Sequence, residues 1–169
     1  PTTMERVLAV SATLAVGAGQ GGHLLREMIR DGFNISAMGH KVFDGVMLMM
    51  TGGGDEFPFT YGTATDPVSG KTDGIFARCT AAAACPKLIH LDSSNDFWQS
   101  RASLVATGGT AVDVALPSDV RAYLMSSTQR FPADRPVPGD CQHPNNPAPH
   151  SPIVRVMLDH LAAWARGGK

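Results

Sequence analysis

An almost unbroken run of apolar residues is the first clear pattern along this chain. Residues 7–16 have the sequence VLAVSATLAV, rich in β-branched side chains and followed by glycines. Such a run is typical of a strand buried on both faces of a sheet. From His23 the apolar positions recur at helical spacing, and Asp31-Gly32 is a helix-ending signal. The pattern therefore predicts a strand, a tight glycine turn and a helix.

Three further strands and a terminal helix are predicted downstream. The strands cover residues 41–50, 87–91 and 120–125, a short helix covers 75–84, and a strongly amphipathic helix covers 153–166. Residues 55–74 and 131–152 are rich in turn-forming residues and are expected to be surface segments. Strands that alternate with helices predict an α/β fold, with a mostly parallel sheet of about four strands and flanking helices.

The carboxyl ends of parallel strands are where functional loops gather. In this chain those loops are residues 17–22, 51–56, 92–98 and 126–130. Elsewhere the bulky side chains are expected to pack in the core, because Met fills irregular gaps and a strand histidine is usually hydrogen-bonded. The residues assigned to packing are Met47, Met49, Met50, His90, Trp98 and Trp164.

Length and composition indicate one globular domain over residues 1–169. Hydrophobic residues make up 43% of the 169 residues and charged residues 17%, with a formal net charge of -1. No run of Lys and Arg supplies the basic face that nucleic acid requires, so no nucleic-acid partner is expected. No apolar stretch reaches the length of a membrane span, and the first residues do not resemble a secretion signal. We expect a soluble chain without a membrane partner, with a cytoplasmic location favoured.

Three cysteines, Cys79, Cys85 and Cys141, are an odd number in a chain large enough to fold without covalent staples. A disulfide framework is therefore not expected. A single bond between Cys79 and Cys85, or a long-range bond to Cys141, stays open.

The glycine turn GAGQGG, residues 17–22, has two chemical interpretations. It fits G-x-G-x-x-G between a strand and a helix, which is the context of a dinucleotide-binding loop. That fingerprint also needs an acidic residue about 20 residues on, at the end of the next strand. Asp31 caps a helix and Asp44 falls inside the strand, while Asp55 and Glu56 end that strand but lie too far along. The same turn has the flanking glycines of a nucleophile elbow, G-x-S-x-G, with Gly19 at the position of the serine.

A set of motifs spread from Leu14 to Trp164 resembles a bacterial family of α/β-hydrolase domain proteins. The motifs, in the order of that family, are GAGQGGHLLREMIRDGFN, KVFDGV, DPVSGKTDGIFAR, SSNDFW, STQRFP and CQHPNNP. They correspond to the C-terminal half of the fold, from the elbow strand onward. The resemblance implies an α/β-hydrolase fold and an ancestry of serine hydrolases that act on esters.

The resemblance also identifies the positions of the catalytic triad. The serine position falls on Gly19, the acid on Asp96 and the histidine on Arg130. Glycine has no nucleophile and arginine does not act as a base near neutral pH, so ordinary serine catalysis is expected to be impaired. Arg130 is expected to pair with Asp96, while the Gln20 N–H at the helix N-terminus still faces the place of an oxyanion.

Other candidate ligand-binding positions surround the elbow. Gly21 lies in the turn, and His23 with Ser93 or Ser94 is a candidate replacement pair, against a simpler interpretation of these side chains as surface and capping groups. Cys141, His143 and His150 match no zinc spacing, and we expect a covering loop there with no metal. No cofactor is expected.

Three functional hypotheses follow. In the first, the chain is an esterase-like hydrolase relative that binds a small ester or carboxylate with Gly19, Gln20, Asp96 and Arg130. In the second, it is a non-catalytic binding or assembly subunit; dinucleotide binding is a third. Because the elbow strand is apolar and lacks the strands that precede it in the full fold, we expect its edge to pair with a second copy or with a partner chain.

Overall fold

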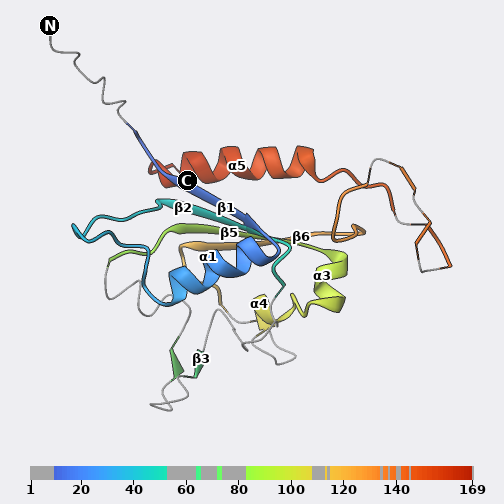
Figure 1. The fold of residues 1–169 in the computed structure, drawn as a ribbon, viewed down its shortest axis with the longest axis horizontal. Coiled ribbons are helices and arrows are strands. Elements are labelled where there is room, and N and C mark those ends of the chain that lie inside the picture. The colour runs from blue at the N-terminus through green and yellow to red at the C-terminus, as the bar shows by residue number, and fades with distance from the viewer. Residues whose placement is uncertain are drawn as a thin grey trace, which may run out of the picture.

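Four parallel strands form the central sheet of the computed structural model (Figure 1). The structure describes residues 10–52, 64–65, 72–73, 83–107, 113, 115–133, 135–136, 138–139, 142–144 and 146–168. The sheet order is β1-β2-β5-β6, with β1 Leu14–Ala18, β2 Gly45–Met49, β5 Lys87–Ser93 and β6 Val120–Met125.

The helices are α1 Gln20–Arg30, α3 Ser94–Gln99, α4 Leu104–Thr107 and α5 Ser151–Ala165. Two short strands, β3 Ala64–Thr65 and β4 Thr72–Asp73, pair in an antiparallel manner. The predicted α/β fold with a parallel sheet is confirmed.

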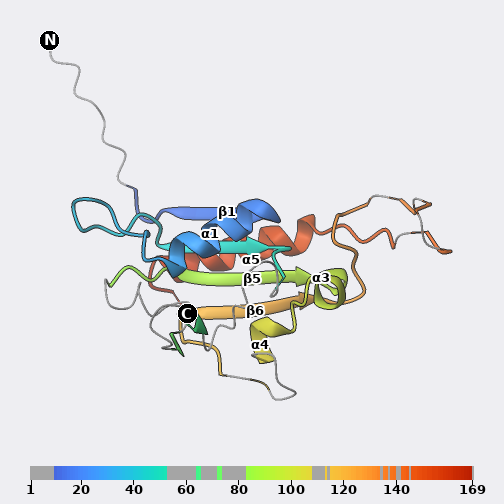
Figure 2. The same cartoon turned by 60° about the horizontal axis from the view of Figure 1, so that its bottom comes forward.

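One helix lies on each face of the sheet. Figure 2 shows α1 in front of the strands and α5 behind them. The alternation of β2 explains both contacts, because Val46 and Leu48 pack in the α1 layer and Met47 packs against α5. Both sets are fully buried. The strand is therefore apolar on both faces, as its unbroken hydrophobic sequence predicts.

The terminal helix is the amphipathic helix that the sequence predicts. Leu161 and Trp164 are buried against Met47 and Ile89, with Val154, Met157 and Leu158 packed around them. The guanidinium carbon of Arg121 lies 4.1 Å from the centre of the Trp164 ring, on which it stacks. Trp98 does not share this role, because 81% of its surface is exposed, and its assignment to packing is wrong. It lies on α3 beside Phe97, whose ring it meets edge to face.

Several element boundaries differ from the sequence prediction. The first strand begins at Leu14, because its partner β2 begins at Gly45 and no paired strand lies beside residues 10–13 in the described chain. Helix α1 begins at Gln20, three residues before the predicted start, because Gly21 and Gly22 take helical positions. Residues 94–99 are a helix and not a loop. The predicted helix over 75–84 and most of the 55–74 segment lie outside the described residues.

Strand β1 lies at the edge of the sheet, as expected from the sequence. Among the described residues, β2 is the strand that pairs with it. Val16 of β1 is 46% exposed, although it is apolar. The edge and this side chain together leave a surface that the described part of the chain does not cover.

Cys85 is disulfide-bonded, and its partner cysteine lies outside the described residues. A bond of Cys85 is among the alternatives that the sequence left open. Within the described residues, no helix is both long and apolar enough to cross a membrane.

Candidate functional site

The loops that follow the four strands meet at one end of the sheet, as predicted. The Gly19 N–H donates to the Met49 carbonyl at 2.9 Å, and the Met50 N–H donates to the Leu91 carbonyl at 3.0 Å. On the far side, the Asn95 N–H donates to the Thr128 carbonyl at 3.2 Å. These main-chain bonds tie neighbouring strand ends together, so side chains from distant parts of the sequence share one site.

The turn between β1 and α1 has the backbone of a nucleophile elbow. Gly19 lies between the strand and the helix with φ 52° and ψ -121°, a conformation that side-chain-bearing residues seldom adopt. Among the residues that the structure describes, a Cβ built on Gly19 meets nothing closer than Arg130 Nη2, at 4.0 Å. The backbone at Gly19 therefore has the shape that would present a nucleophile, but glycine has no side chain and supplies no nucleophilic group.

Two of the surrounding glycines are required by close packing. A Cβ on Gly17 would lie 2.5 Å from the Gly21 carbonyl oxygen, and a Cβ on Gly22 would lie 2.1 Å from Thr51 Cγ2. By contrast, a Cβ on Gly21 would meet nothing within 4 Å. The tight approach of α1 to β1 and β2 thus depends on Gly17 and Gly22 and not on Gly21.

Asp96 is held rigidly in the first turn of α3 and is fully buried. Its Oδ2 accepts from the Ser93 N–H at 3.0 Å and from Ser93 Oγ at 2.5 Å, while the Asp96 N–H donates back to Ser93 Oγ at 3.1 Å. This reciprocal pattern is a capping box, which fixes the carboxylate at the helix start. The other oxygen, Oδ1, is buried and accepts no hydrogen bond from the described residues.

Arg130 extends into the place between Asp96 and Gly19. Its Nη1 lies 3.6 Å from Asp96 Oδ1, which is the ion pair expected from the sequence, and donates to Ser100 Oγ at 2.9 Å. Its Nη2 donates to the Met50 carbonyl at 3.2 Å. The guanidinium is thus held by three residues, Asp96, Ser100 and Met50. These contacts orient it toward the turn at Gly19.

The proposed replacement pair is not assembled by these contacts. Ser93 is buried and its hydroxyl is bonded to Asp96. Ser94 Oγ donates to the Met125 carbonyl at 3.3 Å and accepts from the Ser127 N–H at 2.7 Å, so both serines serve as capping groups. His23 Nδ1 lies 3.1 Å from Arg26 Nη2, one turn along α1.

A buried hydrogen-bonded chain supports the loop after β2. His90 Nδ1 lies 2.9 Å from Asp92 Oδ2, and His90 Nε2 lies 2.7 Å from Thr51 Oγ1. Burial alone would raise the pKa of Asp92, but the charge and hydrogen bond of His90 and main-chain bonds from Gly52 and Thr51 bring the pKa below its usual value. Thr51, His90 and Asp92 are thus linked in the same order as the nucleophile, base and acid of a catalytic triad. Because Thr51 and His90 have almost no exposed surface, we assign them to support and not to catalysis.

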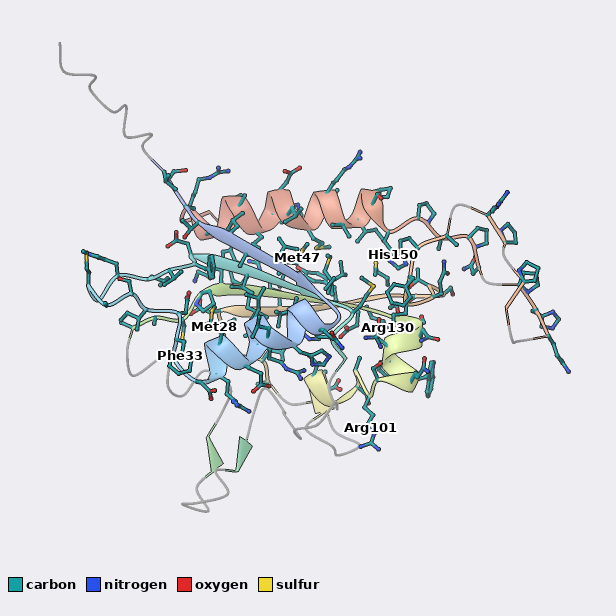
Figure 3. All side chains as sticks on the ribbon, in the orientation of Figure 1. Met28, Phe33, Met47, Arg101, Arg130 and His150 are labelled. Atoms are coloured by element: carbon teal, nitrogen blue, oxygen red, sulfur yellow. The ribbon has the colours of Figure 1, made fainter. Side chains whose placement is uncertain are left out.

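His150 is a site residue that the sequence analysis placed in a covering loop. Figure 3 shows His150 and Arg130 at the same end of the sheet, above and below the strand ends. The His150 ring is buried at the start of α5, and Asp96 and the main chain of Gln129 both act on it. Burial lowers its pKa below the usual value, although Asp96 and Gln129 oppose that shift. The proline-rich sequence around it gave no periodic signal for this placement.

Two ligand sets are missing from the described part of the chain. No group of three or more His, Cys, Asp or Glu side chains there could hold a metal ion. The residues directly after β2 are Met50, Thr51 and Gly52, so an acidic side chain for a ribose is not found at that strand end.

The comparison with known families agrees with this geometry. The family model described as an alpha/beta hydrolase domain matches residues 2–169. No curated protein matches the chain. No solved structure matches it either.

Proposed function

Because the chain belongs to the alpha/beta hydrolase domain family, we propose that it is an esterase-like relative whose site binds a small ester or carboxylate without serine catalysis. The observation that carries the proposal is the elbow at Gly19. Its backbone keeps the conformation that presents a nucleophile, and the side chain that would react is replaced by open space in front of Arg130.

Arg130 supports binding and argues against turnover. A guanidinium stays protonated near neutral pH and cannot take a proton from a hydroxyl or a water. The same group is well suited to a carboxylate, to which it donates charge-assisted hydrogen bonds. Its contacts with Ser100, Met50 and Asp96 hold it in place before any ligand arrives, which lowers the entropy cost of binding.

The start of α1 adds a second attraction for an anion or for an ester carbonyl. Gln20 is the first residue of the helix, so its N–H belongs to the group of donors that intrahelical bonds leave free. In a serine hydrolase the equivalent donor stabilises the oxyanion of the tetrahedral intermediate. Without a nucleophile, the same donor and Arg130 would hold the ligand in its ground state.

The catalytic part of the proposal is tested with p-nitrophenyl butyrate. We expect no saturable hydrolysis by the native chain, and saturable hydrolysis by the Gly19→Ser/Arg130→His double variant. Adding Asp96→Asn to the double variant should abolish that activity, because the imidazole would lose its orienting carboxylate. Saturable turnover by the native chain overturns the proposal, and an inactive but folded double variant contradicts the elbow assignment.

The binding part is tested by titrating the native chain with butyrate, followed by calorimetry or ligand-observed NMR. Arg130→Gln should weaken binding by about tenfold or more, since hydrogen bonds to charged groups contribute about 1.5–3 kcal/mol. Arg101→Gln is the matched control, because Arg101 is exposed and points away from the site in Figure 3. Equal binding by the native chain and Arg130→Gln contradicts the assigned role of Arg130.

A further inference from the structure

Buried polar atoms that lack a hydrogen-bond partner gather beside Arg130. They are Asp96 Oδ1, His150 Nε2, and both Oε1 and Nε2 of Gln129. Asp96 Oδ1 has the charge of Arg130 nearby, but the distance of 3.6 Å is too long for a hydrogen bond. Most buried polar groups in proteins are paired, so several such atoms in one place indicate a ligand-binding function.

The residues that carry these atoms neighbour Arg130 in space or in the chain. Asp96 is the acid of the site and forms an ion pair with Arg130. Gln129 precedes Arg130 in the chain, and His150 interacts both with Asp96 and with the main chain of Gln129. The side chains of Asp96 and His150 are each more than nine-tenths buried, at 0% and 5% relative exposure.

The hydrogen bond to Gln129 determines which nitrogen of His150 is available. The interaction with the Gln129 main chain favours the protonated ring, as a carbonyl that accepts from a ring N–H does. Nε2 has no hydrogen-bond partner among the described residues. We assign the proton of the neutral ring to Nδ1, so that Nε2 presents a lone pair.

The unpaired groups are therefore mainly acceptors. Asp96 Oδ1, His150 Nε2 and Gln129 Oε1 all accept, whereas Gln129 Nε2 donates. A simple carboxylate ligand also offers only acceptors, so it would satisfy Arg130 and leave His150 and Asp96 unpaired. A complementary ligand has to bring a hydrogen-bond donor as well as an anion.

We propose that the site recognises a small hydroxy acid, whose carboxylate binds Arg130 and whose hydroxyl donates its one hydrogen bond to the unpaired acceptor His150 Nε2. This inference rests on the proposed carboxylate-binding function and specifies its ligand. A neutral hydroxyl is preferred to an ammonium group here, because a cation bound beside Asp96 Oδ1 would lie next to the like charge of the Arg130 guanidinium, 3.6 Å from that oxygen.

The test compares four acids of the same carbon skeleton: butyrate, 2-hydroxybutyrate, 3-hydroxybutyrate and 2-aminobutyrate. Each is titrated into the native chain and followed by ligand-observed NMR. We expect one hydroxy acid to bind at least about tenfold more tightly than butyrate, because a ligand without the donor leaves buried acceptors unpaired. His150→Phe should remove that preference, so that this variant binds the hydroxy acid and butyrate with equal affinity. His160→Phe, on the exposed surface of α5, should keep the preference.

A second measurement does not depend on the folding of a variant. In native chain labelled with ¹⁵N-histidine, the Nε2 resonance of His150 should have the shift of an unprotonated nitrogen at neutral pH. It should move on addition of the preferred hydroxy acid and not on addition of butyrate. A proton found on Nε2 in the free chain overturns the assignment of the acceptor.

The outcomes separate this inference from the proposed function. Equal affinities for butyrate and both hydroxy acids overturn the hydroxy-acid proposal and leave carboxylate binding intact. Tightest binding of 2-aminobutyrate also overturns it, in favour of an amino acid. If none of the four acids binds, the proposed carboxylate-binding function fails and the inference fails with it.

Discussion

The imidazole of His90 lies against the carboxylate of Asp92, with 2.9 Å between Nδ1 and Oδ2 and with both side chains excluded from solvent. The pair contacts the loop that follows β2, because Thr51 Oγ1 of that loop lies 2.7 Å from His90 Nε2. The same loop offers the Met50 carbonyl to Arg130 and the Gly52 N–H to Asp92. The position of Arg130 is thus linked to a buried pair that no ligand contacts.

Removal of His90 should destabilise the fold strongly. His90→Ala leaves the Asp92 carboxylate buried without its cationic or donor partner, a change that typically costs about 3–5 kcal/mol. Thr51→Val keeps the shape and removes one buried hydroxyl, so it should cost about 1–2 kcal/mol. Urea denaturation at neutral pH measures both. A smaller loss for His90→Ala than for Thr51→Val would contradict the role assigned to the pair.

The lowered pKa of Asp92 predicts a specific loss of stability in acid. In the folded chain this pKa lies below the ordinary value of 3.8, so the carboxylate stabilises the fold fully above about pH 4. That contribution is lost as the pH falls through the lowered folded-state pKa. Asp92→Asn should therefore flatten the decline of unfolding free energy below about pH 4, whereas Asp159→Asn on exposed α5 should leave the decline unchanged.

Two adjacent glycines should respond in opposite ways to the same substitution. Gly22→Ala places a methyl group 2.1 Å from Thr51 Cγ2, and the resulting overpacking should cost about 1–3 kcal/mol or more. Gly21→Ala meets open space inside a helix, so it should be neutral or should stabilise by up to about 1 kcal/mol. Thermal unfolding of the two variants beside the native chain gives the comparison. Similar melting temperatures for both variants would show that α1 does not pack as closely as described.

The open edge of β1 should mediate self-association. We propose that a second copy pairs with it, because the strand carries no charged side chain that would repel its own image. Sedimentation velocity is expected to show a dimer for the native chain and a monomer for Val16→Lys. Val156→Lys is the matched control, since Val156 is 49% exposed on α5, away from the edge. A monomeric native chain at high concentration rules out this contact.

Periodicity was sufficient for the sheet and for the long helices. The strand over Val120–Met125 has the bounds that the sequence predicts, because its alternation ends at clear turn residues. Helix α3 was missed, although Ser93 and Asp96 have the spacing of a capping box. Its few residues lack the apolar repeat on which helix prediction rests.

The candidate site was only partly accessible from the sequence. The ion pair of Arg130 with Asp96 followed from the family resemblance, which placed the two residues after the neighbouring strands β5 and β6. His150 was not found as a site residue, since a loop rich in proline has no periodicity that fixes where its side chains point. Thr51 was not found because its role depends on the register of β2 against β5, which the sequence does not state.

The backbone of Gly19 has a consequence for how such a chain can change over time. With φ 52° and ψ -121°, any residue other than glycine would carry about 1–3 kcal/mol of strain there. Serine at this position would therefore lower the ratio of folded to unfolded chain, by about tenfold for each 1.4 kcal/mol of strain. Glycine at this turn therefore opposes the gain of a nucleophile, because Gly19→Ser alone loses stability and arginine at position 130 supplies no base.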